Sequence, residues 1–177
     1  MSISGHKVSL AFCAMIALAC RSERGGLTES QKLAVRDSAR SVVREVFDRA
    51  NKLDFAGAFQ AYSDDPDARY AESGFLYPSV DSLRKTYATL QPTLEMVENT
   101  VISWNVLVLG EDVAAMTLPV HLRIKAKGRQ PYIGEYVWSG IVQRRAAGWK
   151  VVQSHESYLE ADKVMAAITS PAEPKSK

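Results

Sequence analysis

The chain has 177 residues, of which 46% are hydrophobic and 24% are charged. These proportions are typical of a single domain with its own hydrophobic core. The 22 basic and 20 acidic residues leave a formal net charge of +2, and they are interspersed along the sequence. Nucleic acid binding requires a concentrated basic surface, so we expect no nucleic acid partner.

The amino terminus has the pattern of a bacterial signal peptide. A mostly apolar run, 8–19, follows two basic residues and is too short to span a bilayer. Small residues end this run, and Cys20 follows directly. The junction resembles a lipoprotein processing site. We expect 1–19 to be removed and Cys20 to be acylated, with cleavage and secretion without a lipid as the alternative.

This interpretation places the protein in the bacterial cell envelope. Arg21 stands after the acylated position, which resembles lipoproteins that are sent to the outer membrane and face the periplasm. Residues 20–27 are then a flexible linker (a leash) between the lipid and the folded domain, and the lipid is the only membrane contact. Cys13 leaves with the signal peptide, so the folded domain has no thiol. Cysteine nucleophiles and thiolate metal sites are therefore excluded.

The first half of the domain predicts three helices. Thr28 and Gln31 have the spacing of a capping box, and apolar residues then recur at three- and four-residue steps as far as Ala50. The other elements expected in this half are a short helix capped by Asp54 that carries Phe55 to Tyr62, a turn over 63–67, a strand over 68–72, and a third helix that opens at Ser79 or Asp81 and ends before Pro92.

The second half predicts a β-sheet. The expected strands are one long strand over 93–109 with a bulge midway, then 113–124, 132–145 and 149–157. The connections are too short for helical crossovers, so the strands form an antiparallel meander. The folded domain then spans 28–158, and 159–177 is a short helix followed by a disordered tail.

The last strand carries the main functional signal. An alternation of period two places Trp149, Val151, Gln153, His155 and Ser157 on one face. This face begins apolar and ends polar, which is typical of the wall of a pocket. His155 is a candidate general base or hydrogen-bond donor to a ligand. The alternative is a buried histidine whose hydrogen bonds are satisfied by neighbouring groups.

The order of elements, together with this strand, resembles the nuclear transport factor 2-like superfamily. Trp149, Val151, His155 and Ser157 are similar to the closing strand of its polyketide-cyclase-like and uncharacterised branches. Asp65 resembles an acidic residue at the mouth of these domains. The resemblance covers about 28–157 and implies a cone-shaped α+β fold, with three helices of the amino-terminal half packed on a curved antiparallel sheet. Ketosteroid isomerase shares this fold, as do members without known activity.

Three functions remain open, and the first choice is a non-catalytic domain that binds a small apolar ligand. The candidate ligand-binding residues are Tyr62, Tyr70, Trp104, Tyr136, Trp138, Gln153 and Ser157. The alternative for the aromatic residues among them is packing in the core or at a dimer interface.

The second hypothesis is a proton-transfer enzyme, an isomerase, dehydratase or cyclase, that uses His155 and Asp65. Other carboxylates considered for this chemistry are Glu72, Glu135 and Glu156, but Glu156 falls on the wrong face if His155 points inward.

The third hypothesis is a homodimer that forms through the outer face of the sheet. We expect no metal ion and no cofactor, since no pair of histidines comes close enough to share a metal.

Overall fold

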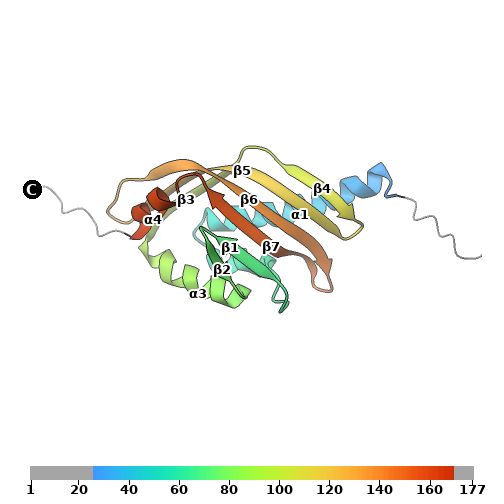
Figure 1. The fold of residues 1–177 in the computed structure, drawn as a ribbon, viewed down its shortest axis with the longest axis horizontal. Helices are drawn as coiled ribbons and strands as arrows, with labels where there is room; N and C mark the ends of the chain where they lie inside the picture. The colour runs from blue at the N-terminus through green and yellow to red at the C-terminus, as the bar shows by residue number, and fades with distance from the viewer. Residues whose placement is uncertain (1–25, 170–177) are drawn as a thin grey trace, which may run out of the picture.

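The computed structural model describes residues 26–169, in which a curved sheet wraps around one long helix (Figure 1). The elements are α1 (Glu29–Ala50), α2 (Phe55–Ala58), the 3-10 helix η1 (Phe59–Ala61), β1 (Arg69–Glu72), β2 (Phe75–Tyr77), α3 (Val80–Leu90), the 3-10 helix η2 (Gln91–Thr93), β3 (Leu94–Val101), β4 (Asn105–Gly110), β5 (Val113–Ala126), β6 (Tyr132–Arg145), β7 (Gly148–Tyr158) and α4 (Ala161–Thr169). The seven strands form one sheet in the order β2-β1-β7-β6-β5-β3, and β4 also pairs with β5.

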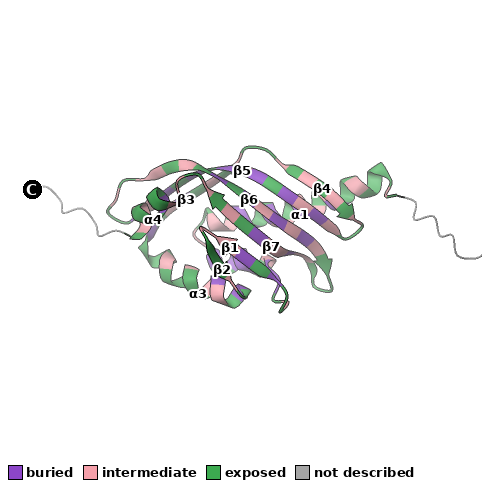
Figure 2. Cartoon of the chain, viewed as in Figure 1, coloured by how far each residue is buried: buried purple, intermediate pink, exposed green. Residues whose placement is uncertain are grey.

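The helices begin where the sequence predicts. The side chain of Thr28 accepts a hydrogen bond from the Gln31 backbone, and the Gln31 side chain accepts one from the Thr28 backbone, so α1 opens with the expected capping box. Asp54 caps α2 through the backbone N–H of Gly57. Ser79, and not Asp81, caps α3. One face of α1 is buried against the sheet, as Figure 2 shows.

The antiparallel meander of β3 to β7 is confirmed, but its first strand differs from the prediction. The single strand expected over 93–109 is divided into β3 and β4, and both pair with the long β5. The structure also adds a strand that the sequence analysis missed. A turn with positive φ at Ser73 and Gly74 returns the chain as β2, which pairs antiparallel with β1.

A parallel ladder joins the two halves of the chain. β1 pairs with β7 in parallel, although the two strands are far apart in the sequence. This ladder places Glu72 beside Glu156. Parallel pairing needs a long connection, and here all of α3 and the meander supply it.

A β-bulge in β7 decides which residues point inward. Val151 pairs with Val142 and Gln153 pairs with Ile141, so Val152 is an extra residue without a partner on β6. The buried residues Val151 and Ser154 are therefore three positions apart instead of two. The prediction that the inner face continues through Gln153, His155 and Ser157 is wrong, because the bulge exchanges the two faces. The inner face continues instead through Ser154 and Glu156.

The ends of the chain lie partly outside the described residues. The expected signal peptide, Cys20 with its leash, and the tail over 170–177 fall there. The expected short carboxy-terminal helix is α4, and its Val164 is buried in the common core. Within 26–169, none of the helices combines the length and the apolar composition that crossing a bilayer needs.

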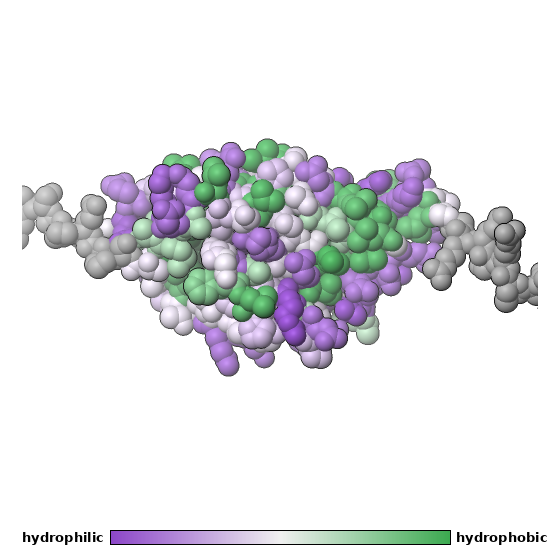
Figure 3. All heavy atoms as spheres, in the orientation of Figure 1, coloured by the Kyte–Doolittle hydropathy of each residue, from purple (hydrophilic) through white to green (hydrophobic). Residues whose placement is uncertain are grey.

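The outer face of the sheet carries exposed apolar side chains. Figure 3 shows hydrophobic residues gathered over β4 and the adjoining part of β5. Leu107 and Leu109 of β4 are 64% and 54% exposed, and Ile133 and Val137 of β6 are exposed as well. Pairing of two copies through this face remains a prediction, which sedimentation measurements test.

Candidate functional site

A cavity of about 90 Å³ lies between the helices and the inner face of the sheet. Its walls come from α1, α2, η1, α3 and strands β1, β3, β5, β6 and β7, and α4 closes one side. Most of the lining is aliphatic or aromatic, including Phe47, Phe59 and Leu122. Among the described residues, the lining contains no lysine, arginine or histidine. The charged groups that face it are the carboxyls of Glu72 and Glu156.

The sheet register brings three polar side chains of the cavity into one row. Trp138 of β6 is the neighbour of Glu156 on β7, and Glu156 is the neighbour of Glu72 on β1. Adjacent strands are about 4.8 Å apart, so side chains that follow one another along such a row are in contact distance. We refer to Glu72 and Glu156 as the carboxyl pair.

Tyrosine hydroxyls hold the carboxyl pair. Tyr158 donates a hydrogen bond of 2.6 Å to Oε2 of Glu156, and its oxygen lies 3.4 Å from Oε1 of Glu72. Tyr87 of α3 donates a hydrogen bond of 2.9 Å to Oε2 of Glu72. Tyr158 therefore stands between the two carboxyls and is placed to pass a proton between them.

Burial favours the protonated form of the carboxyl pair. Loss of hydration raises the pKa of Glu156 to about 8, and the nearby charge of Glu72 adds to the increase, while the bond from Tyr158 opposes it. Burial also raises the pKa of Glu72 against the bonds from Tyr87 and Tyr158. Both shifts favour retention of a proton by the pair. Burial raises the pKa of Tyr87 and Tyr158 well above 10, so both remain hydroxyl donors.

A second network fixes the wall beside the carboxyl pair. Tyr136 stacks on Tyr158, with ring centroids 4.8 Å apart and planes 21° apart. The Tyr136 hydroxyl donates to Oδ1 of Asn99 at 2.9 Å. Asn99 in turn exchanges hydrogen bonds with Asn51, which caps the carboxyl end of α1. These contacts connect β3, β6, β7 and α1 and limit the movement of Tyr158.

The predicted catalytic pair is not brought together in this cavity. His155 is exposed on the outer face of β7. Asp65 lies in the turn before β1, where it accepts a hydrogen bond from the backbone N–H of Asp67 and forms a salt bridge of 3.3 Å with Arg145. Neither residue lines the cavity. The Asp65 carboxyl has the contacts of a turn-forming residue.

The predicted ligand-binding residues divide into two groups. Tyr62, Tyr136 and Trp138 line the cavity. The others do not: Gln153 and Ser157 are on the outer face of β7, and Trp104 packs under the Arg44 guanidinium at 5.5 Å. Tyr70 borders an adjoining space of about 20 Å³, which Glu72 and Glu156 also line.

The sequence analysis identifies the residues that make the site acidic only in part. Glu72 is one of its candidate carboxylates, but strict alternation places Glu156 on the face opposite His155. The sequence analysis selects neither Tyr87 nor Asn99. The available signal was the polar cluster at the end of the last strand, Glu156 to Tyr158, but only the bulge shows which of its members point inward. No group of three or more potential metal ligands comes together within 26–169.

Comparisons with known proteins agree with this architecture. A structure assigned as a scytalone dehydratase of Novosphingobium aromaticivorans superposes with a TM-score of 0.68 at 11% identity, over 74% of this chain and 88% of that chain. A hexachlorocyclohexane dehydrochlorinase of Novosphingobium barchaimii gives 0.65 at 14% identity, over 75% and 91%. A nuclear transport factor 2-like protein of Salmonella enterica gives 0.65 at 14% identity, over 72% and 92%.

At these identities the superpositions establish the fold alone, and it is the predicted nuclear transport factor 2-like fold. No curated protein sequence matches the chain. The family model of the SnoaL-like domain matches residues 39–161, which include the second half of α1, all of α2 and α3, the complete sheet and both members of the carboxyl pair. The chain therefore belongs to the family of SnoaL-like domains, within the nuclear transport factor 2-like superfamily.

Proposed function

We propose that the domain binds a small, largely apolar molecule in the cavity and that the carboxyl pair transfers protons on it. The observation that carries this proposal is the arrangement of Glu72, Tyr158 and Glu156 at the edge of an otherwise apolar cavity. Two carboxyls in one low-dielectric site do not ionise together, so one serves as a base while the other serves as an acid.

The roles follow from the environment of each carboxyl. Glu156, whose pKa is raised to about 8, is the proton donor. Glu72, in its ionised form, is the base, and Tyr87 stabilises its negative charge through a hydrogen bond. After Glu72 takes a proton from one position of the substrate and Glu156 gives one to another, Tyr158 restores both groups by passing the proton back. Acid and base catalysis of this kind accelerates a reaction about 10²- to 10⁴-fold.

The names of structural relatives support the class of reaction. One relative is assigned as a dehydratase and another is named as a dehydrochlorinase. Both names denote eliminations, in which a proton leaves carbon and a neighbouring group departs. Elimination or isomerisation of a small, mostly hydrocarbon substrate is therefore the reaction that we propose for this chain.

Ligand binding without turnover is the second candidate, and the size of the cavity favours it. A volume of about 90 Å³ is smaller than the roughly 150 Å³ cavity that accommodates benzene in an engineered protein. A small ligand fits such a space without bringing a reactive carbon to both carboxyls.

The cell-envelope location and acylation of Cys20 also remain predictions, which mass spectrometry of the membrane fraction tests.

Turnover of a compound panel separates the two candidates. We suggest incubating the purified domain in D₂O with small cyclic ketones, alcohols and halides and following products and deuterium incorporation by ¹H NMR. For any substrate found, Glu72→Gln and Glu156→Gln are expected to reduce the rate about 10²- to 10⁴-fold while retaining binding.

The predicted residues that lie outside the cavity provide the controls. His155→Ala and Asp65→Asn are expected to leave the rate unchanged. Full activity of Glu156→Gln, or loss of activity in His155→Ala, would show that the proton-transfer groups have been assigned to the wrong residues. Binding of panel members without any turnover would favour the second candidate.

A further inference from the structure

The carboxyl pair has more acceptor atoms than the protein supplies with donors. Within 26–169, the hydrogen bonds that reach its oxygens come from the hydroxyls of Tyr87 and Tyr158. Each hydroxyl carries one proton, so each can satisfy one carboxyl oxygen at a time. Oε1 of Glu156 receives no hydrogen bond from the described residues, and it is not among their fully enclosed polar atoms. The short bond from Tyr158 to Glu156 leaves Oε1 of Glu72, at 3.4 Å, as the second oxygen without a donor of its own.

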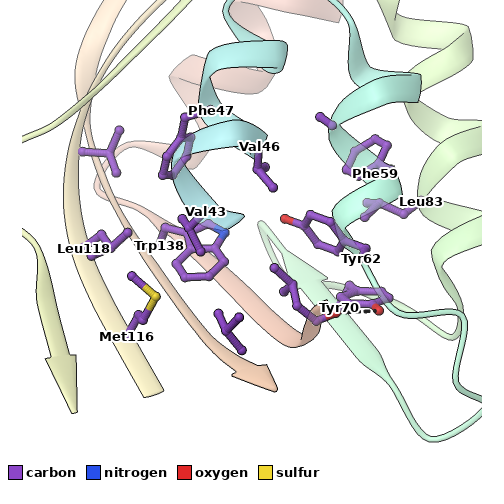
Figure 4. Close-up of a cluster of buried hydrophobic side chains, with 14 of the residues drawn as sticks. Val43, Val46, Phe47, Phe59, Tyr62, Tyr70, Leu83, Met116, Leu118 and Trp138 are labelled. Carbon is purple, nitrogen blue, oxygen red and sulfur yellow. Dashed lines mark hydrogen bonds between the residues drawn. The ribbon is translucent and has the colours of Figure 1, made fainter. Parts of the chain in front are cut away.

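The neighbouring polar groups of the cavity wall are engaged elsewhere. Figure 4 shows the Tyr62 hydroxyl turned toward the indole of Trp138, and the Tyr62 hydroxyl interacts with Trp138 and Ser154. The Tyr136 hydroxyl donates to Asn99. These contacts hold the wall in place and leave the two carboxyl oxygens open. Buried acceptors are satisfied in folded proteins, so a bound molecule or water supplies the missing donors.

The charge of the surroundings gives the chemical class of the molecule that supplies these donors. Glu72 and Glu156 border both the main cavity and the adjoining space of about 20 Å³. Among the described residues, no lysine, arginine or histidine lines either space. An anionic ligand would be buried beside the carboxyl pair without a counter-charge. A cation with N–H groups supplies both the missing donors and the missing charge.

The free protein has already removed these carboxyls from water. Burial raises the pKa of Glu156 to about 8 and raises the pKa of Glu72, so a proton partly compensates their charge in the absence of a ligand. A bound cation takes the place of that proton. The cost of dehydrating the carboxyls is met when the protein folds, so it does not weaken the binding of the cation.

The rest of the wall suits an organic cation. Phe59 contacts Tyr62 and Tyr87, with ring centroids 5.3 and 5.0 Å apart, and Phe55 lies 4.8 Å from Tyr87. All four rings line the cavity. Aromatic rings attract ammonium groups, and an apolar lining accommodates the carbon atoms attached to them. A metal ion would need more ligands than the carboxyl pair, and no third ligand joins the pair within 26–169.

We propose that the cavity binds a small protonated amine, whose N–H groups donate to the free oxygens of Glu72 and Glu156. A secondary ammonium has two N–H groups, which matches the two free oxygens. The volume of about 90 Å³ favours a molecule smaller than the benzene that occupies a cavity of roughly 150 Å³. The inference rests on the part of the proposed function in which the cavity binds a small molecule, and it does not require proton transfer.

Three five-membered rings of nearly the same shape test this ligand class. Pyrrolidine is protonated at neutral pH and carries two N–H donors, tetrahydrofuran carries an acceptor, and cyclopentane carries neither. We expect pyrrolidine to bind about 10- to 100-fold tighter than either neutral ring, because hydrogen bonds to charged groups contribute that much. Dissociation constants are measured by NMR titration of the methyl signals of Leu122 and Ile124, which line the cavity.

Substitution of both carboxyls separates recognition of the charge from filling of the cavity. In the double variant Glu72→Gln, Glu156→Gln we expect the preference for pyrrolidine to disappear, while the melting temperature shows that the fold is retained. Glu135→Gln removes an exposed carboxyl from the outer face of β6 and is expected to keep the preference.

Three results would overturn the proposal: equal binding of the three rings by the wild type, no binding of pyrrolidine, or a preference that survives in the double variant. The failure of the proposed function is a different observation, because it is an absence of turnover in the compound panel. A wild-type preference for pyrrolidine without turnover of any compound supports the amine site and contradicts proton transfer.

Discussion

Replacement of Glu156 by glutamine is expected to reduce the pH dependence of stability between pH 5 and pH 8. In the folded state burial raises the pKa of Glu156 from 4.5 to about 8. Between these values the folded protein holds a proton that the unfolded chain releases. The stabilisation is complete below the unfolded pKa, and it is lost as the pH rises through the folded pKa.

The size of this effect follows from the slope of the free energy of unfolding against pH. When the folded state holds one proton that the unfolded state releases, the free energy of unfolding falls by about 1.4 kcal/mol for each unit by which the pH rises. Glu72 contributes with the same sign, because burial raises its pKa as well. We therefore expect wild-type protein to lose several kcal/mol from pH 5 to pH 8, and Glu156→Gln to become the more stable protein at the upper end.

Urea unfolding at intervals from pH 5 to pH 9 measures the difference. Glu135→Gln is the matched control, because Glu135 is exposed on the outer face of β6 and its replacement removes one carboxyl without touching the cavity. The control is expected to follow the wild-type curve. Parallel curves for the wild type and Glu156→Gln would contradict the assignment of a buried proton to this residue.

Truncation of Trp138 to alanine is expected to cause the largest loss of stability of any single change in the sheet. The side chain is fully buried, and Phe47 and the surface over Gly140 enclose it. Removal of the indole leaves a cavity that the flanking strands cannot close, and such truncations cost about 3–5 kcal/mol. Chemical denaturation at pH 5, below the raised pKa of Glu156, provides the measurement.

Trp104 offers the comparison within the same chain. It is only partly buried and packs under the Arg44 guanidinium, so Trp104→Ala removes a partly solvated contact. We expect it to cost clearly less than Trp138→Ala. Equal losses for the two variants would show that Trp138 does not have the enclosed position described above.

The sequence correctly predicts those helices and strands that are determined by residues close together in the chain. The capping box at Thr28, the spacing of apolar residues along α1 and the short connections between the strands each depend on residues a few positions apart, and they lead to the correct first helix and meander. The parallel pairing of β1 with β7 has no local cause. It depends on the packing of the whole domain, and it is this pairing that brings Glu72 to Glu156.

The site is predicted only in part, because one extra residue, Val152, exchanges the two faces of β7. Tyr62, Tyr136 and Trp138 lie outside β7, and they line the cavity as expected. After Val152 the two faces of β7 are exchanged, so the rule of alternation selects His155 and rejects Glu156. The polar cluster at the end of the last strand therefore indicates the correct strand, but alternation assigns its inward side chains to the wrong face.

The hypotheses of ligand binding and proton transfer now concern the same cavity. Because His155 is exposed, the polar groups that line the cavity are Glu72, Glu156, Ser73, Asn99 and the hydroxyls of the tyrosines. Whether the molecule is only held or is also converted depends on the protonation of the carboxyl pair at neutral pH.

Titration of the side-chain carboxyl carbons by ¹³C NMR measures that protonation directly. Protein with ¹³C-labelled glutamate gives one curve for each residue, and Glu156→Gln identifies the curve of Glu156 by its disappearance. We predict a midpoint for Glu156 near 8 and a raised midpoint for Glu72. Midpoints close to 4.5 for both residues would contradict a buried, proton-sharing carboxyl pair.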